Sequence, residues 1–401
     1  MIEFESAVIG TGPAGMFAAL SLASQGIRTA LVGPLPNWND TRTTALMASS
    51  VTFMRNIGIW NQLESAFTPL KKMRLVDVTE RLIRAPEALF DALELGLDSF
   101  GYNIKNNELN RLLWKVIQEN DFITYFDGTA TQVTSNTERA HIILSCEQEI
   151  TTQFIIGADG RGSKTREAAG INVKSWKYSQ AAVVLNLDHS LPHNYTSTEF
   201  HQRTGPFTLV PLPGNQSSLV CVVTPSQAQE IKALSTLELG FELEKRAHSL
   251  LGAFKIVSDL QVYPLSGFRA LRLSGNRSIL IGEAAHAFPP IGAQGLNLSI
   301  RDIAVATDLA FQAKKHSQAL GNNSMLAAFE RSRSADIITR TNAVDLLNRS
   351  LLSDALPIQA IRTLGLLSAV KIPMVRKVLM REGIAPTWNL PRLMQDTFHS
   401  Q

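Results

Sequence analysis

The chain has 401 residues, 45% of them hydrophobic and 18% charged, a composition typical of a folded protein with two or three domains. Its formal net charge is only +3 and it has no long basic run, so nucleic acid is not expected as a partner. Cys146 and Cys221 lie far apart, without a cysteine or histidine cluster beside them. This pattern excludes a disulfide framework, a metal site and a redox-active dithiol, and we expect both thiols to be buried small apolar groups.

The first predicted element is a buried strand near the amino terminus. It lies in an uncharged stretch from Ser6 to Ile27, which is long enough to mimic a transmembrane helix. Glu3 and Glu5 precede this stretch, where a signal peptide has cations, and glycines interrupt its first third. We therefore expect neither a signal peptide nor a transmembrane helix, and a cytoplasmic protein.

A glycine-rich turn, Gly10-Thr11-Gly12-Pro13-Ala14-Gly15, joins this strand to an apolar helix. In the G-x-G-x-x-G pattern the first glycine permits a tight turn, the second admits a pyrophosphate and the third lets the helix approach the strand. The helix N-terminus then offers N–H groups to the phosphates. An ordinary glycine turn is the alternative, but the strand–turn–helix context favours a dinucleotide site at Gly10, Gly12, Pro13, Ala14 and Gly15.

The second strand, residues 28–32, ends at Gly33, where a carboxylate that holds the ribose is expected. Pro34 and Pro36 follow, so ribose recognition should be weaker or come from elsewhere. The fingerprint occurs once in the chain, which excludes enzymes with separate FAD and NAD domains of this type.

In each of two later segments, a predicted strand is followed by a turn that contains a glycine and an acidic residue. One passes through Asp159-Gly160 into a helix that Ser163 should cap. The other passes through Gly282-Glu283 and a proline loop into a helix start rich in small residues. A simple acidic turn is the alternative for each segment.

Together the three motifs resemble those of the single-Rossmann flavin aromatic hydroxylases, and most closely the hydroxylases of ubiquinone biosynthesis. The matching residues include Asp40, Arg42, Gly101-Tyr102, Asn106, Arg166, Gly205-Pro206, Ala284-Ala285-His286, Pro290, Gly292, Gln294-Gly295, Asn297 and Arg301-Asp302. The resemblance extends from residue 1 to about 385. Departures from the family pattern occur at Gly33, Glu283, Pro289, Ala293 and Ser299, and they indicate a divergent branch.

The resemblance implies a p-hydroxybenzoate hydroxylase-like α/β fold, with a Rossmann-like FAD-binding domain interleaved with an antiparallel-sheet substrate domain and a helical C-terminus. The FAD-binding domain should comprise 1–70, 100–175 and 265–340, the substrate domain 71–99 and 176–264, and the C-terminal region 341–401. The predicted strands are 73–79, 181–187, 207–212 and 218–223, and the predicted helices include 106–118 and 226–250.

The resemblance further implies an FAD-dependent monooxygenase that uses NAD(P)H and O₂ and forms a flavin C4a-hydroperoxide. Its substrate would be a polyprenylated phenol or benzoquinol intermediate of ubiquinone biosynthesis. A hydroxylase of a small soluble aromatic, and a flavin-binding subunit without turnover, remain as alternatives.

The resemblance also assigns roles to individual residues. Gly10, Gly12, Gly15 and Arg42 would bind the ADP half of FAD, and the motif around Asp159 would touch cofactor and nicotinamide. Gly282 and Glu283 would meet the ribityl chain, while Gly295, Leu296 and Asn297 would direct N–H groups to the flavin N1–C2=O edge. The loop carbonyl at Pro290 would lie near the reactive face, and no metal is expected. Alternative interpretations remain open for three residues: Arg42 could be a surface cation, His286 a structural histidine and Arg166 a partner within its own helix.

The stretch from Ala355 to Arg381 mixes aliphatic residues with cations. Two interpretations are open: a packed helical cap, or a basic amphipathic contact with the inner face of a membrane, which would suit a lipid-soluble substrate. Association with other enzymes of ubiquinone biosynthesis is a further expectation.

Overall fold

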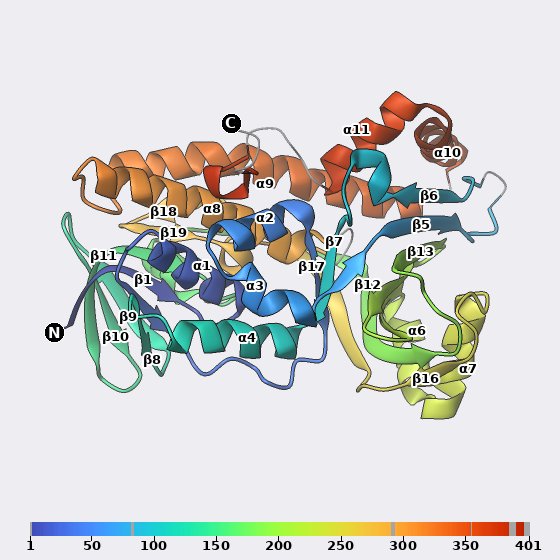
Figure 1. Ribbon diagram of the computed structural model, residues 1–401, viewed down its shortest axis with the longest axis horizontal. Coiled ribbons are helices and arrows are strands. Elements are labelled where there is room, and N and C mark those ends of the chain that lie inside the picture. Colours follow the sequence, from blue (N-terminus) through green and yellow to red (C-terminus); the bar gives the residue numbers. More distant parts are fainter. Residues whose placement is uncertain (1, 82–83, 290–292, 354, 385–389, 397–401) are drawn as a thin grey trace.

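The computed structural model describes residues 2–81, 84–289, 293–353, 355–384 and 390–396. It is a mixed α/β protein in which two large β-sheets lie beside one another, with long helices running across the top of the first sheet (Figure 1). The expected fold class, with a helical C-terminus, is confirmed.

The first sheet is Rossmann-like. Its strand order is β18-β19-β11-β1-β2-β8, and the strands from β19 to β8 are parallel to their neighbours. The bounds are β1 Ile2–Ile9, β2 Thr29–Val32, β8 Ile123–Phe126, β11 Glu149–Gly157, β18 Ser274–Gly275 and β19 Ser278–Leu280. A hairpin of β9 (Ala130–Ser135) and β10 (Ala140–Leu144) continues from β11 in antiparallel pairing.

Strand β1 is buried on both faces because helices cover one side of the sheet and the β9–β10 hairpin covers the other. Val8 packs into the helical side, whereas Ala7 and Ile9 pack toward the hairpin. The covering helices are α1 (Pro13–Ser24), α4 (Asn106–Gln118), α8 (Gln294–Lys315) and α9 (Asn323–Leu352). Helix α1 is buried from Gly15 to Ala23, so the uncharged amino-terminal stretch is a core element. In the described part of the chain no single helix is both long and apolar enough to cross a membrane.

The second sheet has the order β20-β17-β12-β15-β14-β13-β5-β6, with β16 beside β12. Its strands are β5 Lys72–Asp77, β6 Ala88–Asp91, β12 Val173–His189, β13 Thr196–Gln202, β14 Gly205–Leu212, β15 Gln216–Val223, β16 Phe254–Ile256, β17 Gln261–Ala270 and β20 His286–Ala287. Helices α6 (Pro225–Ala233) and α7 (Thr236–Arg246) share a hydrophobic core with it.

Three details differ from the sequence predictions. The second sheet is not wholly antiparallel, because β5 pairs in parallel with β13; the chain enters β5 from the first domain and not through a hairpin. The segment 226–250 contains two helices, since the capping box of Ser235 starts a new helix. Cys146 lies exposed in a turn, so only Cys221 is a buried thiol.

Helix α4 and the four predicted strands are present. The predicted domain limits at 175/176, 264/265 and 340/341 fall inside β12, β17 and α9, each of which is one continuous element. The division into domains stays a prediction.

A small sheet of β3 (Thr43–Met47), β7 (Gly101–Lys105) and β4 (Thr68–Leu70) lies between the two large sheets. Helices α2 (Ala48–Asn56) and α3 (Trp60–Leu63) follow β3. Asn103 Nδ2 donates to the carbonyl of Pro211 at 2.9 Å, which links the small sheet to the second large one.

Two helices, α10 (Leu356–Lys371) and α11 (Pro373–Ile384), lie beyond the end of α9, over β6 and η2 (Ala92–Leu95) (Figure 1). Their inner side packs into a hydrophobic cluster with Met47, Phe90, Phe100 and Ala293. A last turn, η4 (Arg392–Met394), returns to α2 and α8.

Candidate functional site

The three glycine motifs meet at the carboxyl edge of the first sheet. Strands β2, β1, β11 and β19 are parallel neighbours, with Ile9 opposite both Val32 and Gly157, and Gly157 opposite Leu280. The residues that follow these strands therefore lie at one edge, which is where parallel sheets bind dinucleotides.

The first motif is held by close backbone packing. Gly10 has φ +118, and a Cβ there would lie 2.2 Å from the carbonyl oxygen of Ala158. A Cβ at Gly15 would lie 1.8 Å from the carbonyl oxygen of Gly10. Only glycine allows β1, α1 and the turn after β11 to approach this closely.

Gly12 is different, because a Cβ there would meet no atom within 4 Å. It is the N-cap residue of α1, and no side chain caps this helix, whose first residue is Pro13. The backbone around Gly12 thus forms an open cradle beside uncapped helix N–H groups, which fits a pyrophosphate.

The missing carboxylate at Gly33 has a steric explanation. A Cβ at this position would lie 2.8 Å from Thr11 Oγ1 and 3.0 Å from the Thr11 backbone nitrogen. The Thr11 hydroxyl in turn hydrogen-bonds the carbonyl of Pro34. Thr11 therefore occupies the space that a side chain at position 33 would need.

The Asp159 carboxylate is used within its own turn. It accepts hydrogen bonds from Ser163 Oγ (2.6 Å), Thr165 N (3.0 Å) and Thr165 Oγ1 (3.1 Å). Ser163 caps α5 (Lys164–Ala168) as predicted. Arg166 donates to the carbonyls of Ala284 (2.9 Å) and Arg161 (2.7 Å). This geometry favours the local role for Arg166, and a cofactor contact from the Asp159 carboxylate stays a prediction.

Glu283 belongs to a short turn, η3 (Gly282–Ala284), near the beginning of the third motif. Its side chain is 60% exposed and lies 3.4 Å from the guanidinium of Arg161. Arg161 also donates to Ser266 Oγ at 3.0 Å. A Cβ at Gly282 would lie 3.4 Å from that of Ala14, so the first and third motifs are in contact. The carboxylate remains accessible to a ribityl hydroxyl, and that contact stays a prediction.

The start of α8 is fixed by the side chain of Asn297. Its Oδ1 accepts from Met47 N (2.8 Å) and Ser50 Oγ (2.7 Å), and its Nδ2 donates to the carbonyls of Ala45 (2.8 Å) and Ala293 (2.6 Å). Asn297 thereby joins α8 to the junction of β3 and α2, a structural role that the sequence did not reveal.

The N–H groups of the first turn of α8 have no side-chain cap. Among the described residues, a Cβ at Gly295 would meet no atom within 4 Å. The N-cap residue Ala293 keeps a left-handed φ of +53, which explains the glycine of the family pattern. The backbone N–H groups of Gly295 and Leu296 belong to this uncapped turn, and their contact with a negatively charged flavin edge stays a prediction. Pro290 lies outside the described residues.

Arg42 makes a two-pronged ion pair with Asp40, through Nε (2.8 Å) and Nη2 (2.6 Å). Burial raises the pKa of Asp40, but hydrogen bonds from Arg42 and Asn106 outweigh this effect and hold the pKa below its usual range. The Arg42 side chain is 46% exposed and lies 5.4 Å from the centre of the Tyr263 ring. It is therefore a positioned cation, and its contact with the ADP half stays a prediction.

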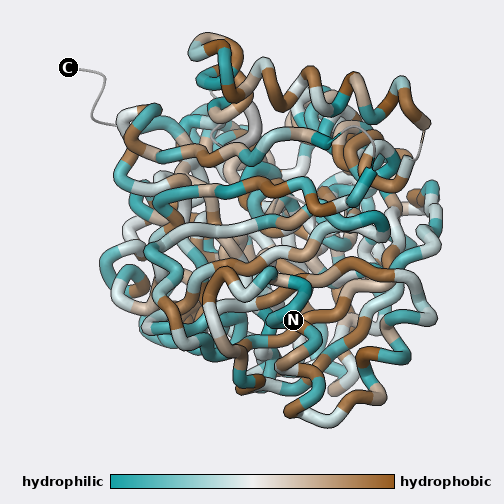
Figure 2. The backbone as a smooth tube through the Cα atoms, turned by 90° about the vertical axis from the view of Figure 1, so that its right-hand side faces the viewer, coloured by the Kyte–Doolittle hydropathy of each residue, from teal (hydrophilic) through white to brown (hydrophobic). Residues whose placement is uncertain are grey.

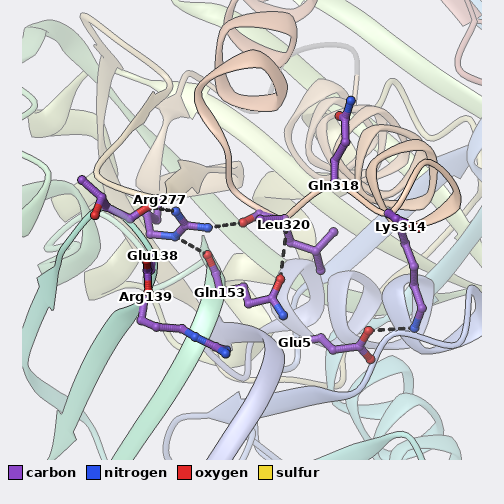
Figure 3. Close-up of a pocket in the computed structure, with 11 residues that line it drawn as sticks. Glu5, Glu138, Arg139, Gln153, Arg277, Lys314, Gln318 and Leu320 are labelled. Carbon is purple, nitrogen blue, oxygen red and sulfur yellow. Dashed lines mark hydrogen bonds and ion pairs between the residues drawn. The ribbon is translucent and has the colours of Figure 1, made fainter.

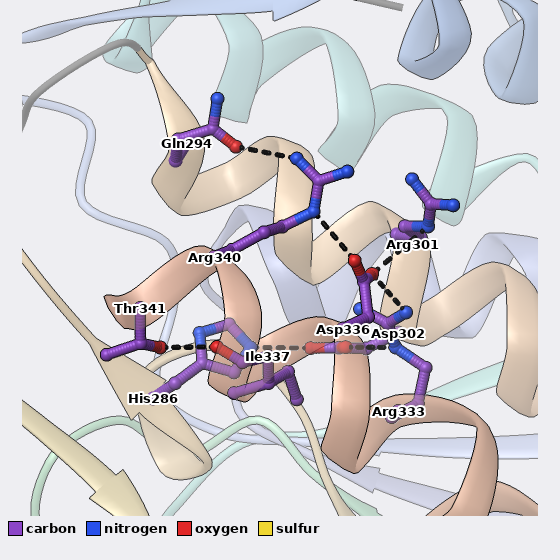
Figure 4. Close-up of polar contacts among 9 residues, drawn as sticks. All are labelled: His286, Gln294, Arg301, Asp302, Arg333, Asp336, Ile337, Arg340 and Thr341. Atoms are coloured by element: carbon purple, nitrogen blue, oxygen red, sulfur yellow. Dashed lines mark hydrogen bonds and ion pairs between the residues drawn. The ribbon is translucent and has the colours of Figure 1, made fainter. Parts of the chain in front are cut away.

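His286 is buried and paired, as the structural interpretation requires. Its Nε2 lies 2.7 Å from Asp302 Oδ2, and the two side chains are 1% and 0% exposed. Asp302 Oδ1 accepts from Arg333 Nε at 2.8 Å (Figure 4). Arg333 gave no sequence signal, because a charged residue within a long helix ordinarily faces water.

A cavity of about 550 Å³ lies at the opposite, amino edge of the first sheet (Figure 3). Glu5 of β1, Gln153 of β11 and Arg277 line it. The Arg277 guanidinium donates to the carbonyls of Gln153, Thr137 and Leu320, so it serves as a backbone clamp. Among the described residues no three His, Cys, Asp or Glu side chains are grouped to hold a metal.

Comparison with known proteins agrees with this geometry. The FAD binding domain family matches residues 3–337. The 3-demethoxyubiquinol 3-hydroxylase of Escherichia coli is 26% identical over 392 residues, covering 95% of this chain and 98% of the relative. The ubiquinone hydroxylase UbiL of Rhodospirillum rubrum is 28% identical over 399 residues, covering 97% and 92%.

Solved structures confirm the fold. The p-nitrophenol 4-monooxygenase PnpA of Pseudomonas putida superposes with a TM-score of 0.77 at 18% identity, covering 95% of this chain and 98% of that one. Klebsiella pneumoniae HpxO in complex with FAD gives a TM-score of 0.74 at 16% identity, covering 94% and 98%. The chain is similar to ubiquinone hydroxylases along nearly its whole length, FAD is its cofactor, and it belongs to the FAD binding domain family.

Proposed function

We propose that this protein is an FAD-dependent, NAD(P)H-using monooxygenase that hydroxylates the aromatic ring of a polyprenylated phenol or benzoquinol intermediate of ubiquinone biosynthesis. The observation that carries the proposal is the cradle at the carboxyl edge of the first sheet, where all three flavin motifs meet. Similarity to ubiquinone hydroxylases along nearly the whole chain supports the substrate class.

The residues of the cradle would bind and orient the cofactor. When bound, FAD supplies the redox chemistry with NAD(P)H and O₂. The backbone at Gly12 and the N-terminus of α1 would hold the pyrophosphate, and Glu283 the ribityl hydroxyls. The uncapped first turn of α8 would favour negative charge at the flavin edge, and Asn297 keeps this turn in place.

The second sheet stands beside the cradle and would position the aromatic ring. Its strand β20 lies within the third motif and pairs with β17. Packed walls of this kind exclude water, which protects the reducing equivalent from loss as peroxide. His286 is buried and contacts Asp302, so we assign it no role in proton transfer from the substrate.

The proposal includes a contact with an anionic lipid bilayer through the outer side of α10 and α11, here called the α10–α11 surface. Its exposed apolar residues are Leu356, Ile358, Ile361, Leu364, Ile372, Met374, Val378 and Leu379, and hydrophobic segments lie along these helices at the top of Figure 2. Exposed cations Lys371, Lys377 and Arg381 accompany them.

Charge complementarity selects the bilayer as the occupant. No acidic residue occurs between 355 and 381, and apolar side chains combined with cations suit an anionic lipid surface. The inner side of the same helices packs on Met47 and Ala293, which adjoin the start of α8. A lipid-soluble substrate would thus approach from the side of the protein that adjoins the flavin site.

Turnover of purified protein tests the proposed reaction. We expect NAD(P)H oxidation to be stimulated by a short-chain prenylated phenol and one ¹⁸O atom from ¹⁸O₂ to enter the aromatic ring. A flavin that NAD(P)H never bleaches, with substrate present, would identify a non-catalytic subunit. Stimulation only by small polar phenols would identify the soluble-substrate alternative.

A further inference from the structure

A chain of polar and charged side chains connects His286 of β20 with Gln294 of α8 (Figure 4); it is buried at His286, Asp302 and Arg333 and partly exposed at Asp336 and Arg340. At one end, His286 contacts Asp302 of α8. Asp302 contacts Arg333 of α9, and Arg333 Nη1 donates to Asp336 at 2.6 Å. Arg333 is 2% exposed, so this part of the chain lies in the protein core.

At its other end the same chain reaches Gln294, the first residue of α8. Asp336 accepts from Arg340 Nε at 2.8 Å, and Arg340 Nη1 donates to Gln294 Oε1 at 3.3 Å. Asp336 also lies 3.2 Å from Arg301 Nε. The side chains of His286 and Gln294 are thus connected through α9.

The acidic and basic side chains of this network carry an excess of positive charge. Two carboxylates, Asp302 and Asp336, face three guanidiniums, those of Arg301, Arg333 and Arg340. Arg301 is a residue of α8, and Arg340 contacts Gln294 at the start of this helix, where the helix dipole is also positive. Both contributions favour an anion in front of this helix end, and buried charges are weakly screened.

We propose that Arg340 is a positioning residue for the flavin: it holds Gln294 and the first turn of α8, and with Arg333 it raises the reduction potential of the bound flavin. This inference rests on FAD as the cofactor and on the proposed placement of the flavin edge at α8. It does not depend on which aromatic substrate is hydroxylated.

Arg340 offers a tractable test because its side chain is 18% exposed, so its replacement should leave the core folded. Arg340→Met removes one positive charge and the contact with Gln294, whereas Arg340→Lys keeps the charge but loses the forked geometry. Arg349→Met is the matched control, since Arg349 lies on the same helix and makes the same i,i+4 pair, with Asp345 at 2.8 Å, away from Gln294.

The readout is the two-electron midpoint potential of bound FAD, measured by dye-linked titration of the FAD-loaded protein without aromatic substrate. We expect Arg340→Met to weaken binding of reduced relative to oxidised flavin roughly tenfold, which lowers the potential by about 30 mV. Arg340→Lys should lower it by less, and Arg349→Met should leave it unchanged.

Two results would overturn this proposal. One is a midpoint potential of bound FAD that is the same in Arg340→Met as in Arg349→Met. If Arg340 had a purely structural role, its replacement would lower the thermal midpoint of unfolding and leave this potential unchanged. The other is complete loss of FAD from Arg340→Met, which would assign Arg340 to binding. Failure of the wild type to hydroxylate a prenylated phenol would count against the proposed function alone, since the titration uses no such substrate.

Discussion

The backbone of Gly10 lies against the carbonyl of Ala158, so close that a Cβ at Gly10 would lie 2.2 Å from that oxygen. Ala158 N also donates to the carbonyl of Ile9 at 2.8 Å. The first and second flavin motifs are therefore one packed unit, in which some glycines serve the fold and others leave room for the cofactor.

Gly12 and Gly10 should respond differently to substitution. Gly12→Val places its side chain in open space at a φ of −70. We expect the apoprotein to keep its stability within about 0.5 kcal/mol, while FAD affinity falls roughly 100-fold or more. Gly10→Ala should instead destabilise the fold by about 2–4 kcal/mol, through backbone overlap and a positive φ.

Flavin fluorescence titration and urea unfolding separate these two effects. Gly365→Val, at an open position on α10, serves as the control and should bind FAD normally. A Gly12→Val protein that purifies yellow and fully loaded would contradict the assignment of the cradle.

Glu283 should contribute to cofactor affinity and little to stability. Its ion pair with Arg161 is long and exposed, and such pairs contribute less than about 1 kcal/mol. We expect Glu283→Gln to weaken FAD binding about tenfold, because a neutral amide accepts weaker hydrogen bonds from ribityl hydroxyls. Glu167→Gln, which removes an exposed carboxylate paired with Lys164, is the control. Equal FAD affinity in both variants would refute the ribityl contact.

The two thiols should differ in reactivity. Cys146 is exposed, whereas burial raises the pKa of Cys221 to about 11. At pH 8 a thiol reagent should therefore modify one thiol per native chain and two after unfolding, and Cys146→Ser should remove the native reaction. Rapid modification of two thiols in the native protein would show that Cys221 is accessible.

Asp336 should make stability depend on acid pH. Burial raises its pKa, but the charges of Arg333, Arg340 and Arg301 outweigh this and lower it below the ordinary value of 3.8. Its contribution to stability is thus complete above pH 3.8 and is lost as pH falls through the lower folded-state pKa.

Asp336→Asn tests this relation by urea unfolding at pH 7 and at acid pH. We expect a loss of about 3–5 kcal/mol at pH 7, because Asp302 alone is then left to balance the guanidiniums of Arg301, Arg333 and Arg340, and a shallower decline below pH 3.8. Glu242→Gln, which breaks the pair with Arg246, should cost less than about 1 kcal/mol. A loss in Asp336→Asn as small as in this control would show that the network adds no stability.

The α10–α11 surface should bind anionic vesicles. Co-sedimentation with phosphatidylglycerol vesicles should retain the wild type, and neutral phosphatidylcholine should retain it less. Replacing Lys371, Lys377 and Arg381 by Gln should reduce retention about tenfold or more, since each basic side chain near the surface contributes about 1 kcal/mol. Equal retention of the protein by anionic and neutral vesicles would contradict the proposed bilayer contact. So would a dimer that buries this surface.

The sequence predicted the three glycine turns that follow apolar strands, because such turns have a local cause. Parallel pairing then brings these turns together, and helix 106–118 was predicted at its observed bounds. The parallel pair of β5 and β13 was missed because its partners are far apart in the chain. The side-chain role of Asn297 depends on contacts with the β3–α2 junction, which no local pattern encodes.

The buried charge network was also beyond sequence reasoning. Arg333 and Asp336 have the spacing of an ordinary surface ion pair on a helix, and only the packing of α9 on α8 buries Arg333. The exposure of Cys146 followed from its place in a turn, where composition had suggested a buried thiol.

The central claim is that this protein hydroxylates a polyprenylated aromatic intermediate of ubiquinone biosynthesis with FAD as cofactor. Mass spectrometry of quinones in lipid extracts from a deletion strain tests it most directly. We predict that an intermediate lacking one ring hydroxyl accumulates, and that the wild-type gene, but not the Gly12→Val variant, removes it. A deletion strain with unaltered quinone intermediates would contradict the claim.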